Sequence, residues 1–264
     1  MIEVDGLVIT FNAGTPLERQ ALRGVSLRLG EGEFVSVIGS NGAGKSTLLG
    51  AIAGDVLPTS GRVLLNGADV SRVPAQARSR HVARVFQDPL AGSCGNLSIA
   101  ENLALAASRG GRRSFLPALR HSRLSRIRAR IEELNLKLED RLDQPMGSLS
   151  GGQRQALSLV MATLAPSSVL LLDEHTAALD PRNAEFVLDL TRDLAARFNL
   201  TVLMVTHSMR HALDTGSRTV MLHEGRILLD VAGERRAGLS IEDLLDEFRK
   251  ARGEALAEDR LLTG

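Results

Sequence analysis

The residues Gly39-Ser-Asn-Gly-Ala-Gly-Lys-Ser-Thr47 decide the fold of this chain. They match the phosphate-binding pattern G-x-x-x-x-G-K-[ST], in which glycines let successive backbone N–H groups turn towards an anion. The apolar run 34–38 before them is typical of a strand, and residues 48–53 continue as a helix. A chance glycine-rich turn would not need this strand, loop and helix order, so we expect a nucleoside triphosphate to bind here.

Each residue type in the loop has a chemical reason. The helix that begins near Lys45 adds unpaired N–H groups and the positive end of its dipole. Lys45 is expected to reach the β- and γ-phosphates of ATP, and the Ser46 hydroxyl to bind Mg²⁺. The residues predicted to bind the nucleotide here are Gly39, Ser40, Asn41, Gly42, Ala43, Gly44, Lys45, Ser46 and Thr47.

Length and composition are those of an ordinary globular protein. The 264 residues carry a net charge of +1 with 24% charged residues, so nothing global indicates nucleic acid as a partner. The single cysteine, Cys94, forms no intramolecular disulfide and fits a reducing compartment. The start of the chain does not resemble a secretory signal, and no apolar stretch approaches the roughly 18 residues of a spanning helix. We therefore expect a cytoplasmic or peripheral protein.

Two carboxylates follow a strand of the buried type. Residues 169–172 are all apolar, which is typical of a strand covered on both faces in a parallel sheet. Asp173 is placed to hold Mg²⁺ through its water shell, and Glu174 to polarise the water that attacks the γ-phosphate. The four preceding apolar residues disfavour the alternative, a pair of solvated turn acids.

Two further strands end in polar residues. Gln87 follows the strand 82–86, and its amide is either an ordinary surface group or a ligand for Mg²⁺ or the attacking water. His207 follows the strand 200–206, in register with the carboxylates, where its imidazole could contact the γ-phosphate. At the end of the first strand, Phe11 is expected with about equal weight to stack on a base or to lie in the core.

The middle of the chain, residues 97–165, has helical character. The residues Ser150-Gly-Gly-Gln153 open a long apolar helix, and Ser150 is a good N-cap. A serine followed by two glycines at a helix start is also a second anion site. Arginines without an intervening acid run from Arg109 to Arg130, and either a solvated helix face or a surface for nucleic acid or lipid headgroups would explain them.

Taken in order, these motifs resemble the nucleotide-binding subunit of ATP-binding-cassette (ABC) transporters from Ile2 to about Phe248. The resemblance rests on the loop at Gly39, Gln87, Leu149-Ser-Gly-Gly-Gln153, Asp173-Glu174, Ala178-Leu-Asp180 and His207. It implies an α/β fold: a P-loop NTPase core with a mostly parallel sheet, an N-terminal antiparallel β subdomain and an inserted α-helical subdomain. The single domain 1–264 would comprise a core of 1–96 and 166–240, a helical subdomain of 97–165, and a closing helix and tail of 240–264.

The resemblance also implies how the sites work. Two copies would dimerise head to tail, so that ATP on one loop is closed over by Ser150, Gly151, Gly152 and Gln153 of the other. Phe11 would stack on adenine, Gln87 couple the site to the membrane partner, Glu174 act as general base, Asp180 contact the second copy and His207 sense the γ-phosphate. Two departures are noted: Phe11 stands where many members have Tyr, and His175 where most have Pro, which we expect to alter the local turn rather than the chemistry.

The expected function is ATP hydrolysis that drives a separate membrane permease, most like a bacterial subgroup of importers linked to aromatic amino acids. The expected partners are a second copy, integral membrane permease subunits and a periplasmic or extracellular substrate-binding protein, with no nucleic acid. The protein would then lie on the cytoplasmic face of the plasma membrane. An exporter or lipoprotein-release ATPase, and a soluble ABC ATPase without a transport role, remain as alternatives.

Overall fold

The computed structural model describes residues 1–111, 121–134 and 136–250 of the chain. In chain order the elements are β1 (Ile2–Phe11), β2 (Arg19–Leu29), β3 (Phe34–Gly39), α1 (Lys45–Ala53), β4 (Ser60–Leu65), β5 (Ala68–Asp69), α2 (Ala75–Arg78), β6 (Val82–Val85), α3 (Ile99–Ala106), α4 (His121–Glu133), η1 (Met146–Ser148), α5 (Gly151–Leu164), β7 (Val169–Asp173), α6 (Pro181–Arg197), β8 (Thr201–Val205), α7 (Met209–Asp214), β9 (Arg218–His223), β10 (Arg226–Ala232) and α8 (Gly233–Ala237). Residues 241–250 form a further helix.

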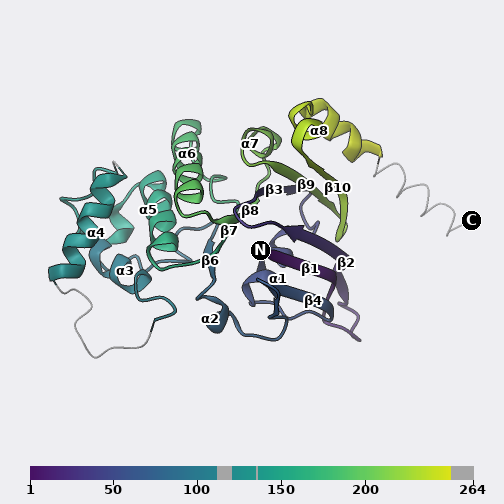
Figure 1. The fold of residues 1–264 in the computed structure, drawn as a ribbon, viewed down its shortest axis with the longest axis horizontal. Helices are drawn as coiled ribbons and strands as arrows, with labels where there is room; N and C mark the ends of the chain where they lie inside the picture. Colours follow the sequence, from purple (N-terminus) through teal and green to yellow (C-terminus); the bar gives the residue numbers. More distant parts are fainter. Residues whose placement is uncertain (112–120, 135, 251–264) are drawn as a thin grey trace, which may run out of the picture.

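Two sheets organise the molecule. The six-stranded sheet has the order β10-β9-β3-β8-β7-β6 and is parallel except for β10, while the four-stranded sheet β2-β1-β4-β5 is antiparallel. Figure 1 shows α3 and α4 at one end of the molecule and the four-stranded sheet at the other, with the parallel strands between them. The predicted α/β fold, with its antiparallel β subdomain and inserted helices, is confirmed.

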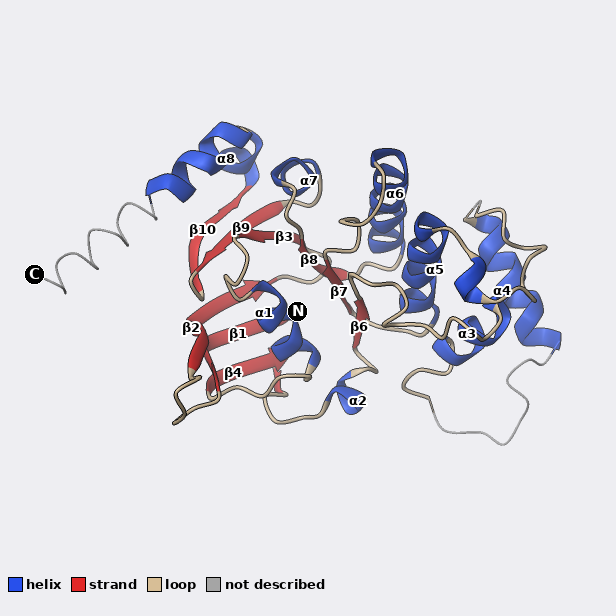
Figure 2. Ribbon diagram, turned by 180° about the vertical axis from the view of Figure 1, so that it is seen from behind, coloured by secondary structure: helices blue, strands red, loops and turns tan. Residues whose placement is uncertain are grey.

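The central strands are buried on both faces, as their continuous apolar runs predict. In β7, Leu170 and Leu172 pack into the core cluster that contains α5 and the helical subdomain. Their neighbours Val169 and Leu171 point the other way, into the cluster that contains α1 and the antiparallel sheet. The sheet therefore separates two cores, and Figure 2 shows α5 and α6 away from the side that carries α1.

The register of the parallel strands aligns their carboxyl ends. Asp173 of β7 pairs with Val205 of β8, and Val205 pairs with Val37 of β3. The residues that follow these three positions therefore emerge at the same edge of the sheet. This edge brings the phosphate loop, Glu174 and His207 together.

Local signals set most element boundaries correctly. Ser150 caps α5 with a reciprocal capping box, in which its hydroxyl accepts from the Gln153 N–H. Asp180 caps α6, and Pro181 is the first helical residue. Within the middle of the chain, which the sequence predicts to be helical, α4 runs from His121 to Glu133 among the described residues.

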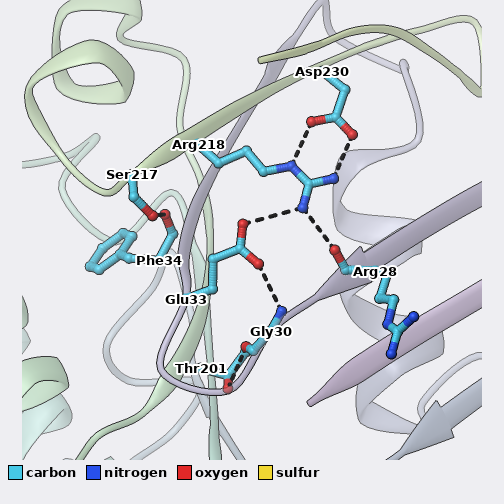
Figure 3. Close-up of polar contacts among 8 residues, drawn as sticks. All are labelled: Arg28, Gly30, Glu33, Phe34, Thr201, Ser217, Arg218 and Asp230. Carbon is cyan, nitrogen blue, oxygen red and sulfur yellow. Dashed lines mark hydrogen bonds and ion pairs between the residues drawn. The ribbon is translucent and has the colours of Figure 1, made fainter. Parts of the chain in front are cut away.

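Arg218 joins the two sheets through the turn between β2 and β3 (Figure 3). Its guanidinium donates to both carboxylate oxygens of Asp230, at 2.5 and 2.6 Å. The remaining nitrogen, Nη1, donates to the Arg28 carbonyl at 2.8 Å and to Glu33 at 3.2 Å. These charge-assisted bonds hold the antiparallel sheet against the nucleotide-binding core.

Arg78 lies under the helix that follows the phosphate loop. Its side chain is 1% exposed and donates to the carbonyls of Ala51 and Ile52 at the end of α1, as well as to those of Ser71 and Val73. A cation at the carboxyl end of a helix also opposes the negative end of the helix dipole. No local pattern indicates this role for Arg78, because the α1 carbonyls that it contacts are distant in the chain.

We predict that Arg78→Met lowers the free energy of unfolding by roughly 3 kcal/mol, because buried carbonyls lose their donors while the side-chain stem is kept. Urea unfolding followed by circular dichroism measures the change. The control is Arg62→Met, which removes an exposed ion pair with Asp5 and should leave the unfolding midpoint where it is. An unchanged midpoint for Arg78→Met would mean that the carbonyls do not depend on the arginine.

Candidate functional site

A pocket of about 290 Å³ lies at the carboxyl edge of the parallel strands. It collects residues from the end of β1, the start of β2, the loop before α1 and the segments after β7 and β8. The lining residues are Phe11, Arg19, Ala21, Asn41, Gly42, Ala43, Gly44, Lys45, Ser46, Thr47, Glu174 and His207. Most of the predicted nucleotide-binding residues therefore surround one cavity.

Close backbone approach fixes two glycines of the phosphate loop. A Cβ atom on Gly39 would lie 2.2 Å from the carbonyl oxygen of Leu222, because β3 and β9 pair at this point. A Cβ atom on Gly44 would lie 2.6 Å from the Ala21 carbonyl oxygen, and Gly44 has a φ of 102°. Neither position accepts a side chain, so the loop keeps its backbone close to the neighbouring strands.

Lys45 is folded back onto its own loop. It is 5% exposed, and its ammonium group donates to the carbonyls of Gly39 at 2.8 Å and Ser40 at 3.0 Å. Burial lowers the pKa of Lys45 from its ordinary value of 10.5, while the carboxylates of Glu174 and Asp173 raise it in part. The amine is thus a cation held beside the pocket and ready to exchange these carbonyls for phosphate oxygens.

Ser46 and Asp173 form a pair of oxygen ligands. The Ser46 hydroxyl donates to Asp173 Oδ1 at 3.1 Å, and the Asp173 residue is 9% exposed. A hydroxyl and a carboxylate are hard oxygen donors of the kind that Mg²⁺ binds next to phosphates. The residues present therefore fit the predicted metal ion, which stays a prediction.

Glu174 and His207 face each other across the pocket. His207 Nε2 lies 2.6 Å from Glu174 Oε1, and the Glu174 side chain is the more buried of the two. Glu174 has a φ of 50°, unusual for a residue with a side chain, and its N–H donates to Val205 at the end of β8. The strained turn directs the carboxylate into the pocket, and its role as general base stays a prediction.

Phe11 lies at the surface rather than in the core. It ends β1, pairs with Arg19 of β2 and keeps 39% of its surface exposed. Of the two interpretations left open by the sequence, this position favours the ring as a stacking surface at the mouth of the pocket. Stacking on adenine remains a prediction.

The predicted site residues that do not line this pocket are Gly39, Ser40, Gln87, Ser150, Gly151, Gly152, Gln153, Asp173 and Asp180. Gln87 is exposed just after β6, so its role as a metal ligand or coupling residue stays a prediction. Ser150 caps α5 and Asp180 caps α6, and the two helix starts are neighbours. Gly152 of α5 lies so close to Asn183 of α6 that a Cβ atom on Gly152 would be 2.7 Å from Asn183 Oδ1, and Asn183 in turn donates to Asp180. The second anion site and the predicted dimer contact therefore share one surface.

Two arginines of the site were not identified from the sequence. Arg19 lines the pocket and donates to the Gly42 carbonyl at 3.3 Å. Arg84 of β6 pairs with Asp173 at 2.8 Å and with Asp55 at 2.6 Å. A charged residue inside a short apolar strand needs a carboxylate partner, and that signal could have found Arg84.

The basic run from Arg109 to Arg130 is not a uniform charged face. Arg109 donates to the carbonyls of Ala162 and Ala165 at the end of α5, and burial lowers its pKa. Arg130 pairs with Glu133 and lies over the Phe198 ring. Within the described part of the run, these two arginines therefore have structural partners; Arg112, Arg113 and Arg120 lie outside it.

A larger cleft of about 680 Å³ lies between β6 and the helices α3 and α5. We call it the β6 cleft; its wall includes Asp55, Arg84, Phe86, Leu105, Arg109 and Met161. Leu105 is 58% exposed, so the cleft has an apolar rim as well as charged groups.

Among the described residues, no helix is both long and apolar enough to cross a membrane.

Comparisons with known proteins identify relatives along most of the chain. A family model described as ABC transporter matches residues 22–177. The chain is 44% identical to a tyrosine transport ATP-binding protein of Clostridioides difficile over 86% of this chain and 90% of that protein. It is 32% identical to the energy-coupling factor transporter ATP-binding protein EcfA2 of Acetivibrio thermocellus, over 94% and 84%.

Solved structures agree with the sequence relatives. A dimeric ATP-binding cassette, MJ0796, bound to ADP and Pi after hydrolysis, superposes with a TM-score of 0.76 and 27% identity over 88% of this chain and 98% of that one. The structure of cbiO1 from Clostridium perfringens, part of the transporter complex cbiONQ, gives a TM-score of 0.74 and 25% identity over 97% and 98%.

His175 follows the predicted base Glu174 and is buried in the core rather than lining the pocket. It is 2% exposed, and Nε2 lies 3.1 Å from the Thr191 hydroxyl of α6. That hydroxyl donates to the Val187 carbonyl, so its oxygen accepts a hydrogen bond from the Nε2–H of the neutral ring. Burial lowers the pKa of His175 to about 3, and a positive charge on nearby His211 acts in the same direction.

We predict that His175 makes the protein less stable below neutral pH. The unfolded chain takes up a proton at an ordinary pKa of 6.5, whereas the folded chain does so only near 3. The contribution of the neutral ring to the free energy of unfolding is complete above pH 6.5 and is lost as the pH falls towards 3. The loss is about 2 kcal/mol at pH 5. Unfolding of the wild type and His175→Gln between pH 5 and 7.5 isolates the effect; parallel curves would contradict it.

Proposed function

Because the chain belongs to the ABC transporter family and is a transport ATPase, we propose that two copies bind two ATP molecules between them and drive a separate membrane permease. The proposal rests on one observation: within one chain, the phosphate loop lines the pocket, whereas Ser150 and Asp180 lie outside it. A second copy, turned head to tail, would bring its Ser150 surface over the pocket. The relative MJ0796 is described as dimeric with ADP and Pi.

In this scheme the chain's own groups perform the chemistry. Phe11 stacks on adenine, the N–H groups of the phosphate loop bind the phosphates, and Lys45 leaves the Gly39 and Ser40 carbonyls for the γ-phosphate. Ser46 and Asp173 would hold Mg²⁺, which neutralises charge on the phosphate oxygens when bound. Glu174 accepts a proton from the attacking water, and His207 holds the Glu174 carboxylate in place.

We propose that the permease docks in the β6 cleft. The cleft combines an apolar rim at Leu105 with half-buried charge at Arg84 and Arg109, a surface suited to an amphipathic helix. Gln87, beside the cleft, is assigned to coupling with the pocket. The chain would then be peripheral on the cytoplasmic face of the plasma membrane, held there by the permease.

The cargo is proposed to be an amino acid taken up from outside, delivered by a separate binding protein. The basis is the 44% identity to a protein described as a tyrosine transport ATP-binding protein. Identification of the membrane protein that copurifies with this chain, and of the amino acid that stimulates the complex, would test the assignment. A copurifying exporter would overturn it and leave the ATPase unaffected.

We predict that Glu174→Gln slows ATP hydrolysis by roughly 10²–10⁴-fold, because a general base contributes about that much. ATP affinity, measured by fluorescence titration, should stay close to that of the wild type, since the amide preserves shape and size. Normal turnover in the variant would remove Glu174 from the role of base.

We predict that Ser150→Arg abolishes ATP-dependent dimerisation, because a long cation replaces a small N-cap on the surface that closes the second site. Sedimentation of the Glu174→Gln background with ATP, with and without the Ser150→Arg change, measures the dimer. The monomer should still bind ATP, since Ser150 does not line the pocket of its own chain. An unchanged dimer would contradict the shared site.

A further inference from the structure

Arg84 connects the predicted metal site to the β6 cleft. Its guanidinium donates through Nη2 to Asp173 Oδ2 at 2.8 Å and through Nη1 to Asp55 Oδ2 at 2.6 Å. The Arg84 side chain is 17% exposed and the Asp173 side chain 12%, whereas Asp55 is 46% exposed. The pair with Asp173 is therefore the shielded one, and the pair with Asp55 is open to solvent.

The position of the guanidinium is fixed from several sides. It lies over the Phe86 ring, with 4.7 Å from Cζ to the ring centroid. The strands β6 and β7 pair in register, with Arg84 opposite Leu171, so the backbone holds Arg84 beside the strand that ends at Asp173. A planar fork held in this way contacts both carboxylates without rearrangement.

Asp173 has its two oxygens assigned to different partners. Oδ2 accepts from Arg84, and Oδ1 accepts from the Ser46 hydroxyl. Since Arg84 occupies one oxygen, the carboxylate cannot rotate without losing a shielded ion pair. The free lone pairs of Oδ1 are thereby directed towards Ser46 and the phosphate loop.

We propose that Arg84 is a positioning residue for the divalent cation: it fixes the Asp173 carboxylate so that Oδ1 faces the metal that Ser46 binds. The inference rests on the proposed Mg²⁺ site. A hydrogen-bonded partner behind a metal-binding carboxylate commonly contributes a factor of 10 to 100 in metal affinity. Simple charge repulsion predicts the reverse, since removal of a cation would tighten metal binding.

The experiment measures Mn²⁺ binding rather than turnover. Wild-type protein in excess over a non-hydrolysable ATP analogue is titrated with Mn²⁺, and free Mn²⁺ is followed by electron paramagnetic resonance. Arg84→Met, which keeps the length of the stem, should bind Mn²⁺ about tenfold more weakly. Arg84→Lys keeps the charge but offers a single point of contact, so its affinity should fall between the two.

Asp55→Asn is the matched control. It removes the solvent-open half of the fork and leaves the bond between Arg84 and Asp173, so Mn²⁺ affinity should stay within about twofold of the wild type. Binding of the analogue in EDTA checks the fold, because the phosphate loop does not contact Arg84. It should be equal in all four proteins.

Unchanged or tighter Mn²⁺ binding by Arg84→Met would overturn the proposal. An equal loss of Mn²⁺ affinity in Asp55→Asn would also overturn it, as would a loss of analogue affinity in EDTA. Either result would mean that Arg84 stabilises the site as a whole and does not position Asp173 for the metal. If the wild type fails to bind Mn²⁺ with the analogue, the Mg²⁺ site of the proposed function is wrong, and the positioning role of Arg84 is overturned with it.

Discussion

The alignment of the carboxyl ends of β3, β8 and β7 is the constraint on which the site depends. Val37, Val205 and Asp173 occupy one row of the parallel sheet, so the phosphate loop, His207 and Glu174 all begin at the same level. The alignment is maintained by two apolar cores on opposite faces of the sheet. A slip of one residue in β7 would turn Leu172 into the wrong core and would move both carboxylates away from the loop.

The chain keeps its two predicted anion-binding helix ends apart. The phosphate loop lies in the pocket, whereas Ser150 opens α5 beside the start of α6, where Gly152 leaves room for Asn183 and no more. That contact ties the helical subdomain to the segment that begins at Asp180. Ser150 and Asp180 therefore lie next to each other on the surface proposed to close over a second copy.

Sequence patterns predicted the parts of the structure that local chemistry determines. The glycine-rich loop, the N-cap at Ser150 and the apolar run 169–172 of β7 each carry a signal within a few residues. Arg78 and His175 carry no signal for their contacts, because their partners lie on elements that only the fold brings near: the end of α1 and Thr191 of α6. Arg84 is a charge inside an apolar strand, which indicates a carboxylate partner but does not say that the partner is Asp173. For Gln87 the sequence pattern identified the residue but not its position, because Gln87 does not line the pocket.

Lys45 gives the nucleotide pocket its shape before any phosphate arrives. Since its ammonium group already cross-links the loop through Gly39 and Ser40, ligand binding exchanges one set of oxygen partners for another and does not order a disordered segment. Binding should then carry a small heat-capacity change and little entropic penalty. Association with the anionic nucleotide would then depend on diffusion and ionic strength.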